Sequence, residues 1–132
     1  MSEKQKTIRQ PIFLKGWGLH TGCEVEVQLK PSAEGTGIQF QRIDLPEQPI
    51  IKATYENAVT NPTIPRCTSI SKSGATIHTV EHLLSVLSGL GIDNLLVEIN
   101  GPELPGLDGS GLEFLKAIQK AGTLEQSQER EY

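Results

Sequence analysis

The stretch HTVEHLLSVLSGLG, residues 78–91, places the end of a strand, a turn and a complete helix next to one another. Its apolar residues recur every three or four positions, which is the spacing of one face of an α-helix. Gly89 and Gly91 are typical of a helix end, because glycine readily adopts the left-handed conformation that closes many helices. The pattern predicts an amphipathic helix whose apolar face packs on a sheet: Val80, Leu83, Leu84, Leu87 and Leu90.

Strands are predicted on both sides of this helix. Between Cys23 and Lys30, apolar residues alternate with charged or polar ones, which is typical of a strand with one face in water. A tight turn is expected at residues 16–18. Further strands are predicted at residues 8–14, 38–40, 50–53, 67–71, 75–78 and 94–99.

A second helix is predicted to start at Ser110. Ser110 and Glu113 have the spacing of a capping box, and Leu112, Leu115 and Ile118 form the predicted buried stripe. Two helices can cover only one face of a sheet of this size. We therefore expect an α+β fold, a two-layer sandwich in which one β-sheet carries two α-helices on one face.

Size and composition limit the class of protein. Of the 132 residues, 1–122 are expected to form one domain, and the polar residues 123–132 a tail or the start of a linker to a second domain. The net charge of −4 argues against a nucleic-acid partner. No apolar run approaches the roughly 20 residues of a membrane span. Cys23 and Cys67 are interpreted as reduced, buried thiols, and the N-terminus lacks an apolar signal segment, so a cytoplasmic protein is predicted.

Chemistry is expected at the start of the first helix, where His78, Glu81 and His82 form the pattern H-x-x-E-H. Projected down the helix axis, Glu81 and His82 flank the polar face, so a metal held by His82 would keep a water within reach of Glu81. The plain alternative is a solvated polar face. One histidine cannot hold a catalytic zinc, since such sites generally use three protein ligands.

Two loops carry further candidate residues. His20 lies in the glycine-rich segment of residues 16–22, where it could reach a substrate or a metal, or simply be a loop histidine bonded to backbone. The loop of residues 101–110 carries Glu103 and Asp108 on a proline-stiffened turn. Asp108 and Ser110 are interpreted there as structural residues that cap the following helix.

Taken together, four stretches resemble the N-terminal half of the zinc-dependent UDP-3-O-acyl-N-acetylglucosamine deacetylases of lipid A synthesis. Any one of them alone is a weak match, but all four in this order and at these separations are specific. They are GWGLHTG at 16–22, CTSI at 67–70, TVEHLL at 79–84 continuing to GLGIDN at 89–94, and PELPGLDGS at 102–110.

The resemblance implies a zinc amidohydrolase that removes acetate from a UDP-sugar lipid. In that family, the position of Glu81 is the general base and the position of His82 is the first ligand of Zn²⁺. Arg66, Cys67 and Thr68 would line the substrate region, and His20 is a further substrate-binding candidate. The family's other ligands, a His and an Asp, and its catalytic histidine acid belong to a second domain. The resemblance therefore implies a half-site that is inactive alone.

Two other interpretations remain open. The chain could be a non-catalytic binding or scaffold module that keeps the fold without the chemistry. It could also be an H-x-x-E-H zinc peptidase, which requires His78 and His82 on one helix, whereas the alternation before His78 favours a strand. If the deacetylase interpretation holds, the face with Glu81 and His82 is half of an interdomain cleft. An exposed apolar patch is then expected there, partly from the loop near Ile64 and Pro65.

Overall fold

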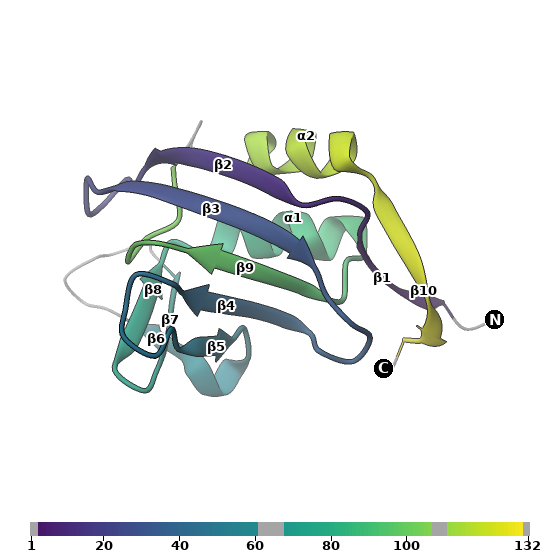
Figure 1. The fold of residues 1–132 in the computed structure, drawn as a ribbon, viewed down its shortest axis with the longest axis horizontal. Coiled ribbons are helices and arrows are strands. Elements are labelled where there is room, and N and C mark those ends of the chain that lie inside the picture. The colour runs from purple at the N-terminus through teal and green to yellow at the C-terminus, as the bar shows by residue number, and fades with distance from the viewer. Residues whose placement is uncertain (1–2, 61–67, 107–110, 131–132) are drawn as a thin grey trace.

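The main layer of the protein is a five-stranded sheet with the strand order β2-β3-β9-β4-β5 (Figure 1). The computed structural model describes residues 3–60, 68–106 and 111–130. Strands β4 and β9 run parallel, and the other neighbours in this sheet are antiparallel. The strands span Ile12–Trp17 (β2), Glu24–Pro31 (β3), Leu95–Ile99 (β9), Ile38–Arg42 (β4) and Ile50–Lys52 (β5).

Two helices, α1 (Glu81–Leu90) and α2 (Leu112–Ala121), lie on the same face of this sheet (Figure 1). The helix α1 ends at Leu90, and Gly91 follows it as a C-cap in the left-handed conformation, as predicted. Gly89, also expected at the helix end, lies inside the helix. The expected α+β arrangement, with both helices on one face, is confirmed. In the described parts of the chain, no helix is both long and apolar enough to cross a membrane.

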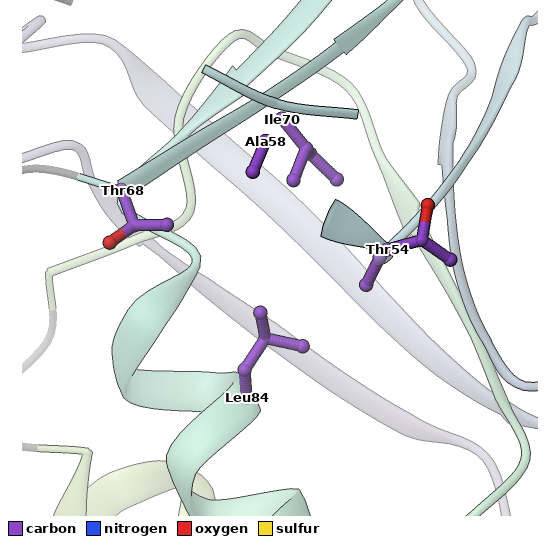
Figure 2. A pocket seen from close by; sticks show the side chains of 6 residues that line it. Thr54, Ala58, Thr68, Ile70 and Leu84 are labelled. Atoms are coloured by element: carbon purple, nitrogen blue, oxygen red, sulfur yellow. The ribbon is translucent and has the colours of Figure 1, made fainter. Parts of the chain in front are cut away.

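Two smaller sheets complete the fold, whereas the sequence predicted a single sheet. A three-stranded sheet contains β6 (Ala58–Thr60), β7 (Thr68–Lys72) and β8 (Ala75–His78), and a 3₁₀ turn η1 (Tyr55–Asn57) precedes it. The predicted hairpin at 67–78 is confirmed as β7 and β8. An apolar hollow lies between this small sheet and α1 (Figure 2).

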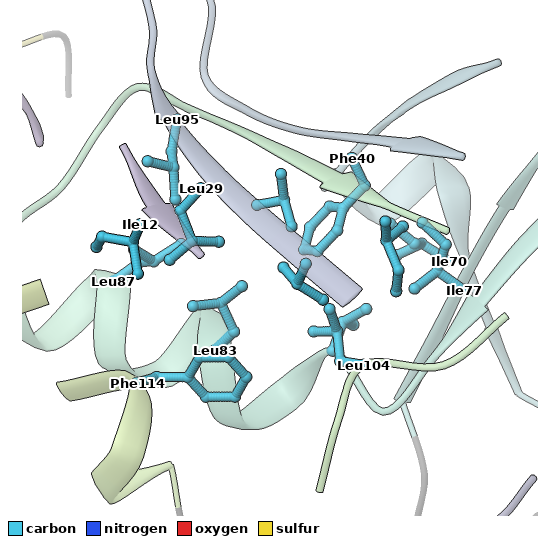
Figure 3. Packing of buried hydrophobic residues seen from close by; sticks show 14 of the residues in the cluster. Ile12, Leu29, Phe40, Ile70, Ile77, Leu83, Leu87, Leu95, Leu104 and Phe114 are labelled. Carbon is cyan, nitrogen blue, oxygen red and sulfur yellow. The ribbon is translucent and has the colours of Figure 1, made fainter. Parts of the chain in front are cut away.

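The core lies between the five-stranded sheet and the helices (Figure 3). Leu83 and Leu87 of α1 and Phe114 and Ile118 of α2 are buried against the inward residues of the strands. Each such side chain contributes about 1.5–3 kcal/mol through its removal from water. The alternation predicted for β3 is confirmed, because its inward residues are fully or almost fully buried: Val25, Val27 and Leu29.

The first predicted strand, residues 8–14, covers the end of one strand and the start of another. Strand β1 (Lys4–Ile8) ends before Arg9, and β2 begins at Ile12. Pro11 lies in the break, and a proline has no amide hydrogen for continuous strand pairing. The tight turn expected at residues 16–18 is also misplaced, because β2 continues to Trp17 and the chain turns at residues 19–21.

The polar C-terminal segment forms a strand where a tail was expected. Strand β10 (Thr123–Glu129) pairs antiparallel with β1. The sequence did not predict this strand, because its residues show no apolar alternation. The strand is held by backbone hydrogen bonds, which do not require apolar side chains. Gln126 also anchors it, since its Oε1 accepts a hydrogen bond of 2.8 Å from Asn94, which is buried. The proposed link to a second domain stays a prediction.

Three other expectations are corrected. Gly111 is the N-cap of α2 and makes no side-chain cap hydrogen bond, so Glu113 is not at the third helical position that a capping box requires. The buried residues of α2 are Phe114 and Ile118, and Leu112 is 44% exposed. Cys23 is exposed, not buried, because it lies in the loop that precedes β3.

Candidate active site

Glu81 and His82 are the first two residues of α1, as predicted. Glu81 Oε1 lies 3.9 Å from His82 Nε2, and the two side chains are 31% and 32% exposed. The pair is therefore partly sheltered and still open to a ligand. The carboxylate and the imidazole are close enough to act on one bound ligand, as a proton-accepting carboxylate and an imidazole ligand must.

The start of strand β7 holds the carboxylate of Glu81. The backbone amide of Thr68 donates a hydrogen bond of 3.2 Å to Glu81 Oε2, and the carbonyl of Thr68 accepts one of 3.2 Å from the amide of Val80. One oxygen of Glu81 is thus fixed while Oε1 stays on the side of His82. The structure places Thr68 in contact with the pair. Arg66 and Cys67 lie outside the described residues.

The donor atoms of the pair fit part of a zinc site. An imidazole nitrogen is a common zinc ligand, and a nearby carboxylate can accept a proton. Among the described residues there is no group of three His, Cys, Asp or Glu side chains that could hold a metal ion. A catalytic zinc at His82 would therefore need ligands from outside these residues.

His78 does not belong to this pair. It ends strand β8, and its Nδ1 lies 2.7 Å from the hydroxyl oxygen of Ser69 on the neighbouring strand. The zinc-peptidase interpretation required His78 on the helix, one turn before His82, and is wrong. The alternation of residues 75–78 had already favoured the strand.

The loop that carries His20 is held through its backbone. The amide of His20 donates to both carboxylate oxygens of Glu103, at 3.0 and 3.2 Å, and the amide of Thr21 donates to Oε1 at 2.8 Å. The side chain of His20 is on the exposed surface. Its role in substrate binding stays a prediction.

Glu103 was noted in the sequence only as one of two loop carboxylates, yet it is 1% exposed. It also accepts a hydrogen bond from the hydroxyl of Thr79, the residue two positions before Glu81. Burial raises the pKa of the Glu103 carboxyl, but the hydrogen bonds from Thr79, Thr21 and His20 together outweigh it and lower that pKa below the ordinary glutamate value. The sequence offered one indication of this buried site, the glycines at positions 18 and 106. A side chain at either position would overlap Glu103 or Leu19. Asp108 and Ser110 lie outside the described residues.

An apolar hollow lies between α1 and the small sheet (Figure 2). Its volume is about 230 Å³. Thr68 lines it as well as binding Glu81, and Leu84 comes from the same helix, three residues after Glu81. The apolar patch was expected on the face that carries Glu81 and His82, partly from Ile64 and Pro65, which lie outside the described residues, so that patch stays a prediction. The remaining lining residues come from the segment around η1 and from β7: Ala53, Thr54, Ala58 and Ile70.

Comparison with known proteins supplies a family for this geometry. A family model described as UDP-3-O-acyl N-acetylglycosamine deacetylase matches residues 5–132. A bifunctional enzyme LpxC/FabZ of Bacteroides thetaiotaomicron is 45% identical over 129 residues, which cover 98% of this chain and 27% of that protein. A UDP-3-O-acyl-N-acetylglucosamine deacetylase of Synechocystis sp. is 48% identical over 120 residues, 89% of this chain and 41% of that protein.

A third relative, a UDP-3-O-acyl-N-acetylglucosamine deacetylase of Geotalea uraniireducens, is 41% identical over 128 residues. These cover 97% of this chain and 41% of that protein. The chain thus spans between about a quarter and two fifths of the length of these relatives.

Proposed function

This chain belongs to the UDP-3-O-acyl N-acetylglycosamine deacetylase family, and we propose that it forms the N-terminal half of an enzyme that removes acetate from a UDP-3-O-acyl-N-acetylglucosamine in lipid A synthesis. The observation that carries the proposal is the pair at the start of α1. Glu81 Oε1 and His82 Nε2 are 3.9 Å apart and partly exposed, as a base and a metal ligand need to be.

Zinc is the proposed cofactor, with His82 as one ligand. When bound, zinc would supply Lewis-acid polarisation of the acetamide carbonyl and activation of a water. The chain's own contribution is the carboxylate of Glu81, whose Oε1 accepts a proton from the attacking water. The amide of Thr68 supports this role, because it holds Oε2, while Oε1 lies 3.9 Å from His82 Nε2.

The rest of the machinery is assigned to a second domain. A catalytic zinc generally has three protein ligands, and the described residues offer one histidine at this place. We infer that a His and an Asp ligand and a catalytic histidine acid come from the part of the relatives that this chain does not match. The acid would stabilise the oxyanion and protonate the leaving amine.

The substrate region is proposed to lie on the side of α1 where Thr68 and the apolar hollow are found. Thr68 supports this because it contacts both the base and the hollow. Arg66 and Cys67, which precede it in sequence, and His20 remain proposed substrate contacts. Asp108 and Ser110 remain proposed structural residues, and the cytoplasmic location remains a prediction.

The test is to combine this chain with a separately produced second domain and to measure acetate release and zinc binding. The expected result is that the mixture binds zinc tightly and releases acetate, while each part alone does so weakly. The variant Glu81→Gln should remove activity and retain zinc, whereas His82→Ala should weaken zinc binding. Acetate release that no second domain restores would favour the alternative of a non-catalytic scaffold module.

A further inference from the structure

Glu103 is the one buried carboxylate among the residues that the structure describes. A buried carboxylate is strongly unfavourable unless donors surround it. Four groups donate to Glu103: the amides of His20 and Thr21, and the hydroxyls of Thr21 and Thr79. These donors come from two segments far apart in sequence, so a single side chain joins the His20 loop to the start of α1.

The His20 loop is packed tightly onto this carboxylate. A Cβ built on Gly18 would lie 2.3 Å from Glu103 Oε1, a distance at which atoms overlap. At the next residue, Leu19, the loop rests on Gly106, where an added Cβ would lie 2.5 Å from the Leu19 Cγ. The amide of Gly106 also donates to the carbonyl of Trp17 at 2.8 Å. The loop therefore has one close-fitting arrangement around Glu103.

Thr79 has an unusual backbone at the second end of this link. Its φ of 61° lies in the left-handed region, which is rare for a β-branched residue. Thr79 is buried, and it lies between His78, the last residue of β8, and Val80, the N-cap of α1. This turn sets the direction in which α1 leaves the sheet, and so sets where Glu81 and His82 stand.

The segment around Glu103 also holds the backbone on the strand side of the turn. The amide of His78 donates to the carbonyl of Pro102 at 2.8 Å, and the amide of Leu104 donates to the carbonyl of His78 at 3.2 Å. His78 and Glu103 form a parallel bridge through these bonds. Glu103 is therefore fixed by its backbone next to the strand, and its side chain is aimed at Thr79.

We propose that Glu103 is a positioning residue of the deacetylase: by binding Thr79 and the His20 loop with one carboxylate, it holds the Glu81–His82 pair and that loop in a fixed mutual arrangement. The inference rests on the proposed function. It differs from a purely stabilising role in what it predicts. A stabilising role lowers activity only in proportion to the protein that unfolds, whereas a positioning role lowers kcat in protein that stays folded.

The kinetic test uses Thr79→Val and Thr79→Ser as a matched pair, together with Glu103→Gln, in the protein that joins this chain to its second domain. Valine keeps the shape of threonine and removes the hydroxyl, whereas serine keeps the hydroxyl. We expect Thr79→Ser to keep kcat within about threefold, and Thr79→Val and Glu103→Gln to lower kcat by about 100-fold with little change in KM. Val97→Ala, which creates a cavity in the core, is the control for lost stability alone.

A second readout does not depend on activity. In this chain alone, Glu103→Gln should speed hydrogen exchange at the amides of His20 and Thr21, and should shift the amide resonances from Thr79 to His82. Val97→Ala should do neither. If wild-type protein releases no acetate, the proposed function fails. The amide measurements would still show whether Glu103 holds the His20 loop and the start of α1 in place. If the Thr79→Val and Glu103→Gln variants keep wild-type kcat, or lose only as much as an equally destabilised Val97→Ala, the positioning role is overturned.

Discussion

The Cα of Gly18 lies so close to the carboxylate of Glu103 that a side-chain carbon added there would stand 2.3 Å from Oε1. These residues are far apart in sequence, one after strand β2 and the other after β9. The same carboxylate accepts hydrogen bonds from the backbone amides of His20 and Thr21. Glycine at 18 is thus required by contact with Glu103, since no positive φ is recorded at this residue.

The first prediction concerns this contact. Gly18→Ala should lower the free energy of unfolding by about 1–3 kcal/mol, because overpacking forces the loop or the carboxylate to move. Gly89→Ala is the matched control, because an added Cβ meets nothing within 4 Å there and the residue is helical. That control should gain about 0.5–1 kcal/mol through helix propensity. Urea denaturation measures both, and a Gly18→Ala protein as stable as wild type would refute the tight packing.

The second prediction is a pH dependence that comes from Glu103. Its folded-state pKa is lowered, so the folded protein favours the charged form. The charged carboxylate of Glu103 therefore contributes its full stabilisation of the folded protein at a pH above the unfolded-state pKa of Glu103. This contribution is lost as the pH falls through the folded-state pKa of Glu103. Wild type should exceed Glu103→Gln in stability at about pH 7, and the difference should shrink as the pH falls below about 4.

The comparison with Glu103→Gln is needed because Asp44 also contributes to acid sensitivity. The hydrogen-bonded guanidinium of Arg42 lowers the pKa of the Asp44 carboxyl, and both proteins share this pair. The free energies of unfolding of the two proteins are measured by urea denaturation across a range of pH. The contribution of Asp44 cancels in their difference. A difference in stability that stays constant from neutral to acid pH would show that Glu103 does not titrate as inferred.

The third prediction tests whether residues 123–129 form a strand in solution. Gln126 donates to the carbonyl of Ser32 at 2.8 Å and accepts from buried Asn94. Gln126→Ala should therefore cost about 1–3 kcal/mol, because it leaves these groups with fewer partners. Gln128→Ala, with its exposed side chain on the same strand, should leave stability almost unchanged. Equal stabilities of the two variants would indicate the polar tail that the sequence suggested.

Periodicity predicted the elements whose burial follows a regular pattern. Strand β3 and helix α1 each present one apolar face, and both were found because the spacing of their apolar residues is the spacing of the backbone. The E-H pair could be placed at the start of α1 for the same reason. The stripe of α2 was predicted only in part: Ile118 is buried as expected, whereas Phe114 is buried in addition and Leu112 is 44% exposed.

The link through Glu103 could not be predicted in this way. A glutamate that follows a proline in a proline-rich loop has the local sequence of an exposed turn. Contacts with distant segments bury it, among them the His20 loop, 83 positions away, and Thr79. The strand β10 was missed for a related reason, since its stability comes from pairing with β1 at the other end of the chain. Both depend on long-range contacts of polar groups, which leave no periodic signal.

The last prediction concerns Gly111, which packs directly on His82. A Cβ added there would lie 3.3 Å from Val86 Cγ2, 3.4 Å from the His82 carbonyl oxygen and 3.5 Å from the His82 Cβ, and the φ of Gly111 is 84°. Gly35 has a similar φ of 77° with nothing within 4 Å of an added Cβ, so the two glycines share a left-handed φ and differ in what an added Cβ would contact. Alanine at either position should cost about 1–2 kcal/mol through left-handed backbone strain. Only Gly111→Ala should shift the ring resonances of His82 and weaken zinc binding by the two-domain protein. If Gly35→Ala moved the His82 signals equally, the effect would come from lost stability, and the start of α2 would have no part in holding the proposed ligand in place.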